Sequence, residues 1–227
     1  MKCALRFVSK VQAHARARFG DDLLAVYLLG SLAHGGYSAD CSDIDVALFF
    51  RPGYEADLDA LRASLRAVDG MLESRLSIFW STPGFIGGRF PALDRIDLLD
   101  HGVLIDGEAI DDLPRPGREA IEAQLRAHAT GYWASLTADF SGDRPADKEL
   151  ARCVLYPARL LYTWQSGEMA SNDVAVQWLN AHPVEGLDLA PINLAMRVRQ
   201  GEQAIRGLDI WRPLLEHQYA VCIAQIG

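Results

Sequence analysis

The fold of this chain is decided by residues 26–50, which read VYLLGSLAHGGYSADCSDIDVALFF. An apolar run ends in Gly30-Ser31, and a second apolar run opens with Asp43 and Asp45, one residue apart. Because side chains at positions i and i+2 of a strand share one face, the two aspartates are expected to point the same way. Two carboxylates on one face repel each other, and divalent cations reverse that penalty. Two-metal sites of this kind drive in-line displacement at phosphorus, so the stretch predicts metal-assisted chemistry on a phosphate.

Gly30 and Ser31 are expected to bind the phosphates of a nucleotide. A glycine at the end of a strand lets the backbone come close to a ligand. Ser31 then stands where a helix begins, with free backbone N–H groups and a hydroxyl for an anion. Ser42, directly before Asp43, is a further candidate for contact with a metal ion or a phosphate. Each half of the pattern has an ordinary alternative, because Gly-Ser also makes turns and aspartates also begin strands, but the combination favours a nucleotide site.

This combination resembles the signature of the polymerase-beta-like nucleotidyltransferase superfamily. Gly30-Ser31 is followed by eleven residues and then by Asp43, Asp45 and an apolar run. The resemblance implies a small mixed sheet that binds a nucleoside triphosphate and Mg²⁺, with Asp43 and Asp45 as catalytic metal ligands. It also implies transfer of a nucleotidyl group to an acceptor, whose identity the motif does not give.

Length and composition limit the kinds of partner. The chain has 227 residues, of which 50% are hydrophobic and 23% are charged, the balance of an ordinary globular protein. Its net charge is −8 and neither half is basic, which argues against a nucleic-acid acceptor. The four cysteines are scattered without metal-ligand spacing, and no run of about 20 apolar residues is long enough to span a membrane. We therefore expect a cytoplasmic protein without a secretory signal or membrane segment, as a monomer or small homo-oligomer.

Periodicity divides the chain into two parts. Residues 1–110 are expected to form a nucleotidyltransferase domain, and residues 111–117, with two prolines and a glycine, a linker. In the first part, strands are predicted at 23–29, 43–50 and 72–80, a short further strand within 93–99 and 103–105, and helices at 2–19 and 57–68. Residues 118–227 carry five helical segments, with Pro157 expected to kink or bound one of them. The predicted fold class is α+β, a small mixed sheet flanked by helices followed by an all-helical bundle that binds the acceptor.

The bundle adds a second resemblance. Residues 154–178 read VLYPARLLYTWQSGEMASNDVAVQW, in which Leu155, Arg159, Tyr162, Gly167 and Trp178 keep the spacing of a known pattern. The segment is similar to the helical domain of the streptomycin/spectinomycin-type aminoglycoside adenylyltransferases. That similarity implies transfer of AMP from ATP to a hydroxyl of a small acceptor, such as an aminoglycoside, and hence antibiotic resistance. By the same resemblance, Arg199 of the bundle is expected to contact the triphosphate.

One position departs from the superfamily pattern. Its members carry a third carboxylate on the next strand, where it serves as metal ligand and general base, and the simplest alignment puts Ser77 there. Glu73 lies on the same face of the expected 72–80 strand but about 13 Å away, so a register shift or bulge is needed to bring it into the site. We assign Glu73 as the third catalytic carboxylate and metal ligand, with a solvent-exposed strand residue as the alternative reading. Asp94 and Asp97 are the remaining substitutes.

The same position supports a different class of function. With Ser77 in place of the acid, the chain would be a catalytically impaired nucleotidyltransferase-like protein, acting as a regulatory or antitoxin-type binding protein. Mg²⁺-dependent ATP binding and pyrophosphate release separate the readings, because a protein that only binds other partners needs neither.

Overall fold

The structure of the chain is a computed structural model that describes residues 1–39, 41–141 and 148–227. The chain forms two compact units, Met1–Pro116 and Gly117–Gly227. The junction between them lies within the proline- and glycine-containing segment 111–117 that the sequence analysis assigned to a linker. The fold class is α+β, as predicted, because the first unit contains a sheet and the described part of the second is helical.

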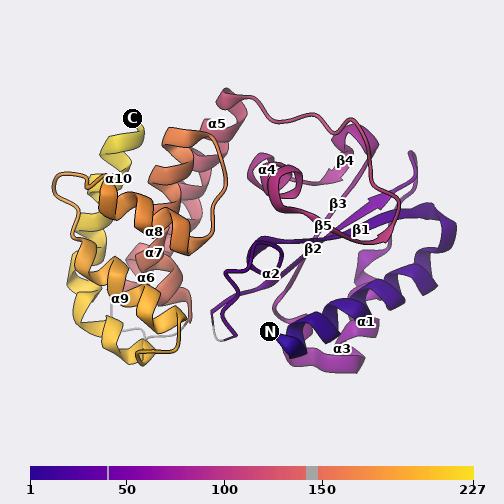
Figure 1. The fold of residues 1–227 in the computed structure, drawn as a ribbon, viewed down its shortest axis with the longest axis horizontal. Coiled ribbons are helices and arrows are strands. Elements are labelled where there is room, and N and C mark those ends of the chain that lie inside the picture. The colour runs from indigo at the N-terminus through magenta and orange to yellow at the C-terminus, as the bar shows by residue number, and fades with distance from the viewer. Residues whose placement is uncertain (40, 142–147) are drawn as a thin grey trace. The chain divides into compact units, whose positions relative to one another are not determined.

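The first unit is built on a five-stranded mixed sheet (Figure 1). Its strands are β1 (Leu23–Leu29), β2 (Ile44–Phe50), β3 (Leu76–Thr82), β4 (Ile86–Arg89) and β5 (Val103–Gly107). The order across the sheet is β4-β3-β2-β1-β5, with β2 parallel to β3 and every other neighbouring pair antiparallel. The predicted small mixed sheet is therefore confirmed, and β2, which carries Asp45, is its central strand.

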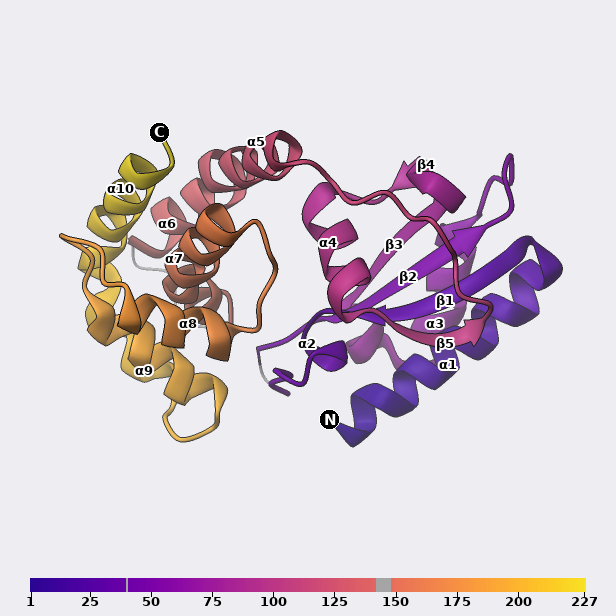
Figure 2. The same cartoon turned by 45° about the horizontal axis from the view of Figure 1, so that its top comes forward.

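Helices cover both faces of this sheet (Figure 2). On one face, α1 (Lys2–Phe19) and α3 (Leu58–Glu73) pack on Ile44, Val46 and Leu48, which are all fully buried. On the other face, Ala47 and Phe49 of β2 form a second cluster with α4 (Ala92–His101) and the segment around Phe85. Since β2 is buried on both sides, nearly all of its residues are apolar, and Asp45 near its start is the exception.

Two expectations about the strands are wrong. The third strand begins at Leu76 rather than at residue 72, because α3 continues through Glu73. Residues 93–99 are helical, as part of α4, and the further strand is β5 alone. The glycine-rich loop also contains the short strand β4, where a Cβ on Gly88 would lie 2.2 Å from the Trp80 carbonyl oxygen. The close approach of the backbones, rather than a β-forming side chain, therefore defines that strand.

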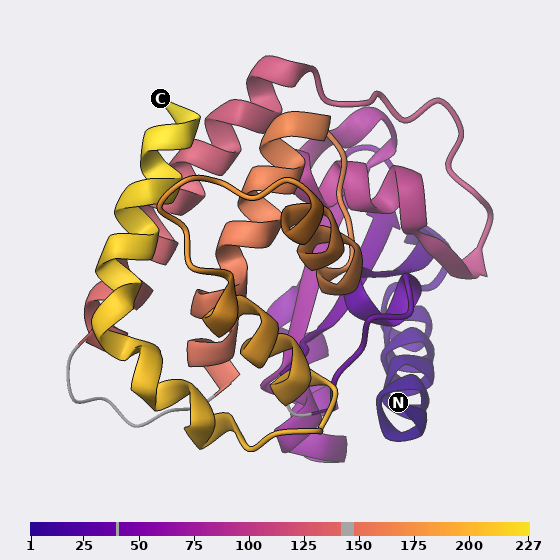
Figure 3. The same cartoon turned by 60° about the vertical axis from the view of Figure 1, so that its left-hand side comes forward.

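The second unit is helical in its described residues (Figure 3). Its α-helices are α5 (Arg118–His128), α6 (Ala134–Ser141), α7 (Lys148–Ser166), α8 (Asn172–Ala181), α9 (Leu189–Arg199) and α10 (Leu215–Ile226). A π-helical turn, Ala129–Trp133, joins α5 to α6, and a 3-10 segment, Ile205–Leu214, leads into α10. Helix α7 runs through Pro157, and α8 begins at Ser171, whose hydroxyl accepts the Val174 N–H at 3.2 Å. None of the described helices is long and apolar enough to cross a bilayer.

Candidate active site

The β1–β2 register brings the glycine and the aspartate of the motif together. Leu29, the last residue of β1, pairs with Asp45 near the start of β2, so Gly30 emerges beside the Asp45 side chain. Gly30 has φ +61°, and a Cβ placed there would lie 2.2 Å from Asp45 Oδ2. A side chain at position 30 is therefore excluded for two reasons: the backbone there is in the left-handed region, and the Asp45 carboxylate occupies the space. Glycine is required at this point of the chain.

Asp43 and Asp45 alternate with buried residues as a strand pattern requires. Asp43 directly precedes β2, Asp45 is its second residue, and both are half-buried, whereas Ile44 between them is completely buried. The Ile44 N–H donates to the Arg75 carbonyl oxygen at 2.9 Å, which fixes the entry of the strand. The motif therefore presents its carboxylates at one end of the central strand, next to the Gly30 turn.

The loop ahead of Asp43 is held by its own hydrogen bonds and by Arg75. The Ser42 hydroxyl accepts the Ser38 N–H at 2.9 Å, and the Ser42 N–H donates to the Ser38 carbonyl at the same distance. The Arg75 guanidinium donates to the carbonyl oxygens of Ala39, at 2.6 Å, and of Ser42. Ser42 is buried and serves this loop, so its expected contact with a metal ion or phosphate stays a prediction. Sequence reasoning missed Arg75, because a single arginine before a strand carries no distinctive signal.

Ser31 lies in the first turn of α2 (Gly30–Ala33) and is half-buried. Within the described residues its hydroxyl has no hydrogen-bond partner. The next turn is closed by the His34 N–H, which donates to the Gly30 carbonyl at 3.1 Å. Ser31 therefore offers a hydroxyl group directly beside the residue that touches Asp45.

A second carboxylate, from α4, also reaches Gly30. Asp97 is only 7% exposed, and its Oδ2 accepts the Gly30 N–H at 2.7 Å. One turn further along α4, the His101 ring meets the His34 ring edge-to-face, with ring centroids 5.8 Å apart. The sequence gives little signal for Asp97, because Asp94 and Asp100 lie three positions to either side of it and only the structure shows which of the three is buried. Asp97 was predicted as a substitute acid on a strand, whereas it lies on a helix.

The position expected for Glu73 is wrong. Glu73 is the last residue of α3 and is 3% exposed. Its Oε1 lies 3.2 Å from Arg62 Nη1, and its Oε2 lies 3.1 Å from Arg66 Nε. Arg62 also donates to the Leu76 carbonyl oxygen at 3.1 Å, which ties the end of α3 to the start of β3. Glu73 therefore uses both carboxylate oxygens in ion pairs with arginines of α3 itself, and it does not lie on the strand beside the aspartates.

Ser77 is the residue that β3 places next to the motif. In the parallel β2–β3 pair, Asp45 is in register with Ser77. Ile78 packs on the α1–α3 face and Phe79 on the α4 face, so Ser77 shares the α4 face with Asp45. The strand next to the aspartates therefore carries a hydroxyl where the superfamily pattern has a carboxylate.

The carboxylates of the motif suit a hard divalent cation. Mg²⁺ prefers oxygen ligands, and proteins usually bind it with one or two carboxylates plus substrate phosphates and water. Asp43 and Asp45 are half-exposed acids beside a glycine that leaves room for a ligand, and they match that requirement. Within the described residues, no three His, Cys, Asp or Glu side chains are arranged to hold a metal ion by themselves. A metal bound here would need ligands from the nucleotide.

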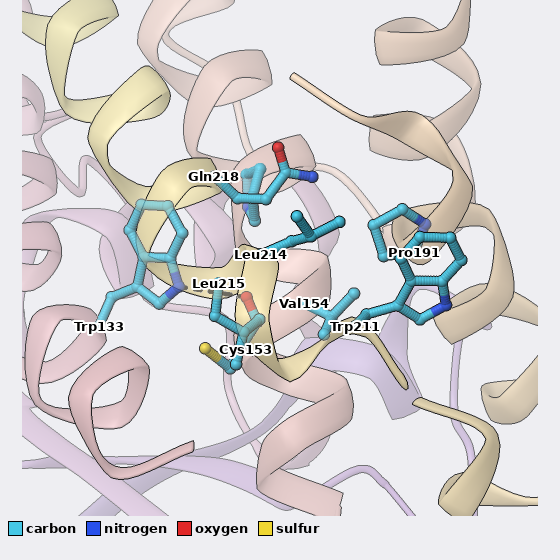
Figure 4. A pocket seen from close by; sticks show the side chains of 9 residues that line it. Trp133, Cys153, Val154, Pro191, Trp211, Leu214, Leu215 and Gln218 are labelled. Atoms are coloured by element: carbon cyan, nitrogen blue, oxygen red, sulfur yellow. Dashed lines mark hydrogen bonds between the residues drawn. The ribbon is translucent and has the colours of Figure 1, made fainter. Parts of the chain in front are cut away.

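The second unit is a compact body of its own. Arg199, the predicted triphosphate contact, is the last residue of α9 and is half-buried. A small cavity of about 10 Å³ lies among α7, α9, α10 and the 3-10 segment (Figure 4). Its walls include Trp133, Val154 and Leu215, while the Gln218 amide is bonded to both backbone groups of Asp188. This space is too small and too apolar for a polyhydroxylated acceptor.

The comparison with solved structures identifies the fold. The crystal structure of spectinomycin adenyltransferase AAD(9) from Enterococcus faecialis, solved with ATP and spectinomycin, superimposes with a TM-score of 0.60. The match covers 95% of this chain and 99% of that one, at 16% sequence identity. This chain has the fold of spectinomycin adenyltransferase. The sequence itself matches no protein-family model and no curated protein sequence.

Proposed function

We propose that the chain transfers AMP from ATP to a hydroxyl group of a small-molecule acceptor, with Mg²⁺ bound by Asp43 and Asp45. The observation that carries the proposal is the packing of Gly30 against the Asp45 carboxylate, with the free Ser31 hydroxyl next to it. A fold shared over 95% of the chain with an adenyltransferase solved with ATP supports the choice of ATP as donor.

Each residue of the site has a part in this reaction. Asp43 and Asp45 hold the metal, and the Ser31 hydroxyl contacts the phosphates, which the missing side chain of Gly30 allows to come close. The bound Mg²⁺ would neutralise triphosphate charge and stabilise the charge that develops at the α-phosphorus. The acceptor hydroxyl attacks that phosphorus, the P–O bond to pyrophosphate breaks, and the hydroxyl proton leaves to the carboxylates or water of the site. Because Ser77 replaces the strand carboxylate, we expect slow turnover.

The proposed acceptor is a cationic small molecule of the aminoglycoside type. The net charge of −8 favours the approach of a polycation, and the structural neighbour was solved with spectinomycin. In that case the biological role is antibiotic modification in the cytoplasm, where ATP is available and the four free cysteines stay reduced.

Mg²⁺-dependent ATP binding, followed by pyrophosphate release with a panel of aminoglycosides and aminocyclitols, tests the proposal. Asp43→Asn should abolish release and leave the melting temperature within a few degrees of the parent. Asp59→Asn, a change at an exposed position of α3, is the matched control and should leave both unchanged. Near-normal release by the Asp43→Asn variant would remove these aspartates from the reaction.

Arg199 is proposed to contact the triphosphate from the second unit. Arg199→Ala should then weaken Mg·ATP binding by about tenfold, the usual cost of losing one charged contact. Arg197, two positions earlier and exposed, provides the control Arg197→Ala. Equal affinities of the two variants would mean that Arg199 does not touch the nucleotide.

The second candidate function is a binding protein that has lost catalysis. The specific observation in its favour is Ser77 in register with Asp45, where the superfamily pattern has an acid. Such a protein needs no Mg·ATP binding and would release no pyrophosphate with any acceptor of the panel. Release above the rate of the acceptor-free control excludes this candidate.

A further inference from the structure

Asp97 is a buried carboxylate without a counter-charge. It lies on α4 between Ile96 and Leu98, which are almost completely buried, and is itself 7% exposed. Within the described residues no basic side chain forms an ion pair with it, and its one hydrogen-bond donor is the Gly30 N–H. Burying an ionised carboxylate costs several kcal/mol unless charge or hydrogen bonds compensate. A stability role alone would favour an apolar residue at this position.

Gly30 is the residue that most needs an external restraint. Its φ of +61° is a conformation that glycine leaves easily, since glycine populates many backbone conformations. A Cβ on Gly30 would lie 2.2 Å from Asp45 Oδ2, so the turn lies close to that carboxylate. The Gly30 N–H points to the opposite carboxylate, Asp97, and so fixes the peptide plane on its N-terminal side. Asp45 and Asp97 thus hold one glycine between them.

We propose that Asp97 is the positioning residue of the nucleotide site, and that it locks the Gly30–Ser31 turn through the Gly30 N–H. The inference rests on the proposed function, in which the Gly30–Ser31 turn contacts the phosphates. Because Asp97 occupies the Gly30 N–H, the Ser31 hydroxyl, which has no partner among the described residues, is the group of the turn that remains for a phosphate. A charged acceptor makes a shorter and stronger hydrogen bond than a neutral one, in agreement with the 2.7 Å distance.

A direct chemical role for Asp97 makes a different prediction. If Asp97 were a metal ligand or the general base, its negative charge would be essential, and asparagine could not replace it. If Asp97 positions the turn, asparagine should largely replace it, because the side-chain oxygen of asparagine can also accept the Gly30 N–H. The comparison of Asp97→Asn with Asp97→Ala therefore separates the two roles.

The test measures the full-length protein in two ways. Titration calorimetry with Mg²⁺ and the slowly cleaved analogue α,β-methylene-ATP gives the nucleotide affinity. Amide hydrogen exchange of residues 28–34, without any nucleotide, gives the order of the turn. Asp100→Ala on the exposed face of the same helix, which loses the ion pair with Arg115, is the matched control.

Asp97→Ala should weaken analogue binding by roughly 10- to 100-fold and speed exchange at Gly30, whereas Asp97→Asn should stay within about threefold of the parent. The control should behave as the parent in both measurements. Loss of affinity in Asp97→Asn equal to that in Asp97→Ala, with exchange unchanged, would overturn positioning in favour of a role for the charge. If the parent protein binds no nucleotide, the proposed function fails, and the exchange data alone still decide whether Asp97 orders the turn.

Discussion

The substitution Ser77→Asp tests the missing carboxylate directly. Ser77 is in register with Asp45 on the parallel neighbour strand and faces the same side of the sheet. Adjacent strands lie about 4.8 Å apart, so the new carboxylate would lie about 5 Å from that of Asp45. At an effective dielectric constant of roughly 20, two like charges at that distance repel by about 3 kcal/mol. Both positions are half-exposed, so screening reduces this, and we expect a loss of about 1–3 kcal/mol of unfolding free energy without metal.

Divalent cations should offset this loss of stability in the Ser77→Asp variant. A third carboxylate beside the motif becomes a metal ligand, and a tenfold gain in Mg²⁺ affinity corresponds to about 1.4 kcal/mol. Differential scanning calorimetry with EDTA and then with millimolar Mg²⁺ and ATP measures both states. The Tm of Ser77→Asp should fall by roughly 5–15 °C in EDTA and recover most of that loss with Mg·ATP. Its rate of pyrophosphate release should exceed that of the parent.

Ser77→Asn is the control, since it has nearly the same shape as the aspartate without the charge. It should show little metal dependence of its Tm beyond that of the parent protein. The reasoning is refuted if the Asp and Asn variants lose equal stability in EDTA, because steric fit would then explain the loss. It is also refuted if Mg·ATP raises the Tm of the Asp variant no more than that of the parent, because the side chain would then lie outside the metal site.

Three further predictions concern stability and binding. Glu73→Gln should lower the free energy of unfolding by about 2–3 kcal/mol in urea titrations, because a buried carboxylate with two arginine partners loses its charge; an unaffected midpoint would contradict the pairing. Gly30→Ala should abolish Mg·ATP binding in calorimetry, since its Cβ would lie 2.2 Å from Asp45 Oδ2; normal affinity would disprove the close packing. Burial, and next the charge of Arg159, lower the pKa of His128 below its usual value, so the unfolded chain binds more protons near that pKa. Stability should therefore fall as pH drops below about 6.5, and His128→Gln should flatten that fall in thermal melts between pH 7.5 and 5.5.

The sheet and the motif were predictable because short-range rules determine both. Alternation puts Asp43 and Asp45 on one side of a strand, and an apolar run ending in Gly30 identifies the neighbouring strand. The β1–β2 pairing places Leu29 opposite Asp45, so Gly30, the next residue, lies beside the Asp45 carboxylate. The hydrophobic period of the sequence changes near residue 117. This change predicts a sheet followed by helices, and the structure agrees.

The strand position of Glu73 was predicted wrongly because the residues before a strand do not show where the preceding helix ends. Residues 72–80 were interpreted with period two, yet α3 ends only at Glu73, beyond a kink at Asp69 whose φ/ψ of −160° and 90° are not helical. Eleven positions span about 16 Å of a straight helix, so the Arg62–Glu73 ion pair depends on this kink, which no spacing rule for regular helices predicts. The same ambiguity turned residues 93–99 into a strand and hid the fact that Asp97 and His101 share a face of α4.

The positions of the acids imply that nucleotide binding and turnover depend on different residues. Asp43 and Asp45 stand on the central strand, where a metal shared with the triphosphate needs only one or two carboxylates. A second metal, close to the attacking hydroxyl, needs further ligands, and β3 offers Ser77 there instead of an acid. Asp97 does not replace that ligand, because its bonded oxygen is held by Gly30 on the β1 side of Asp45. Mg·ATP should therefore bind with ordinary affinity while transfer stays slow, and a carboxylate at position 77 should change the rate more than the affinity.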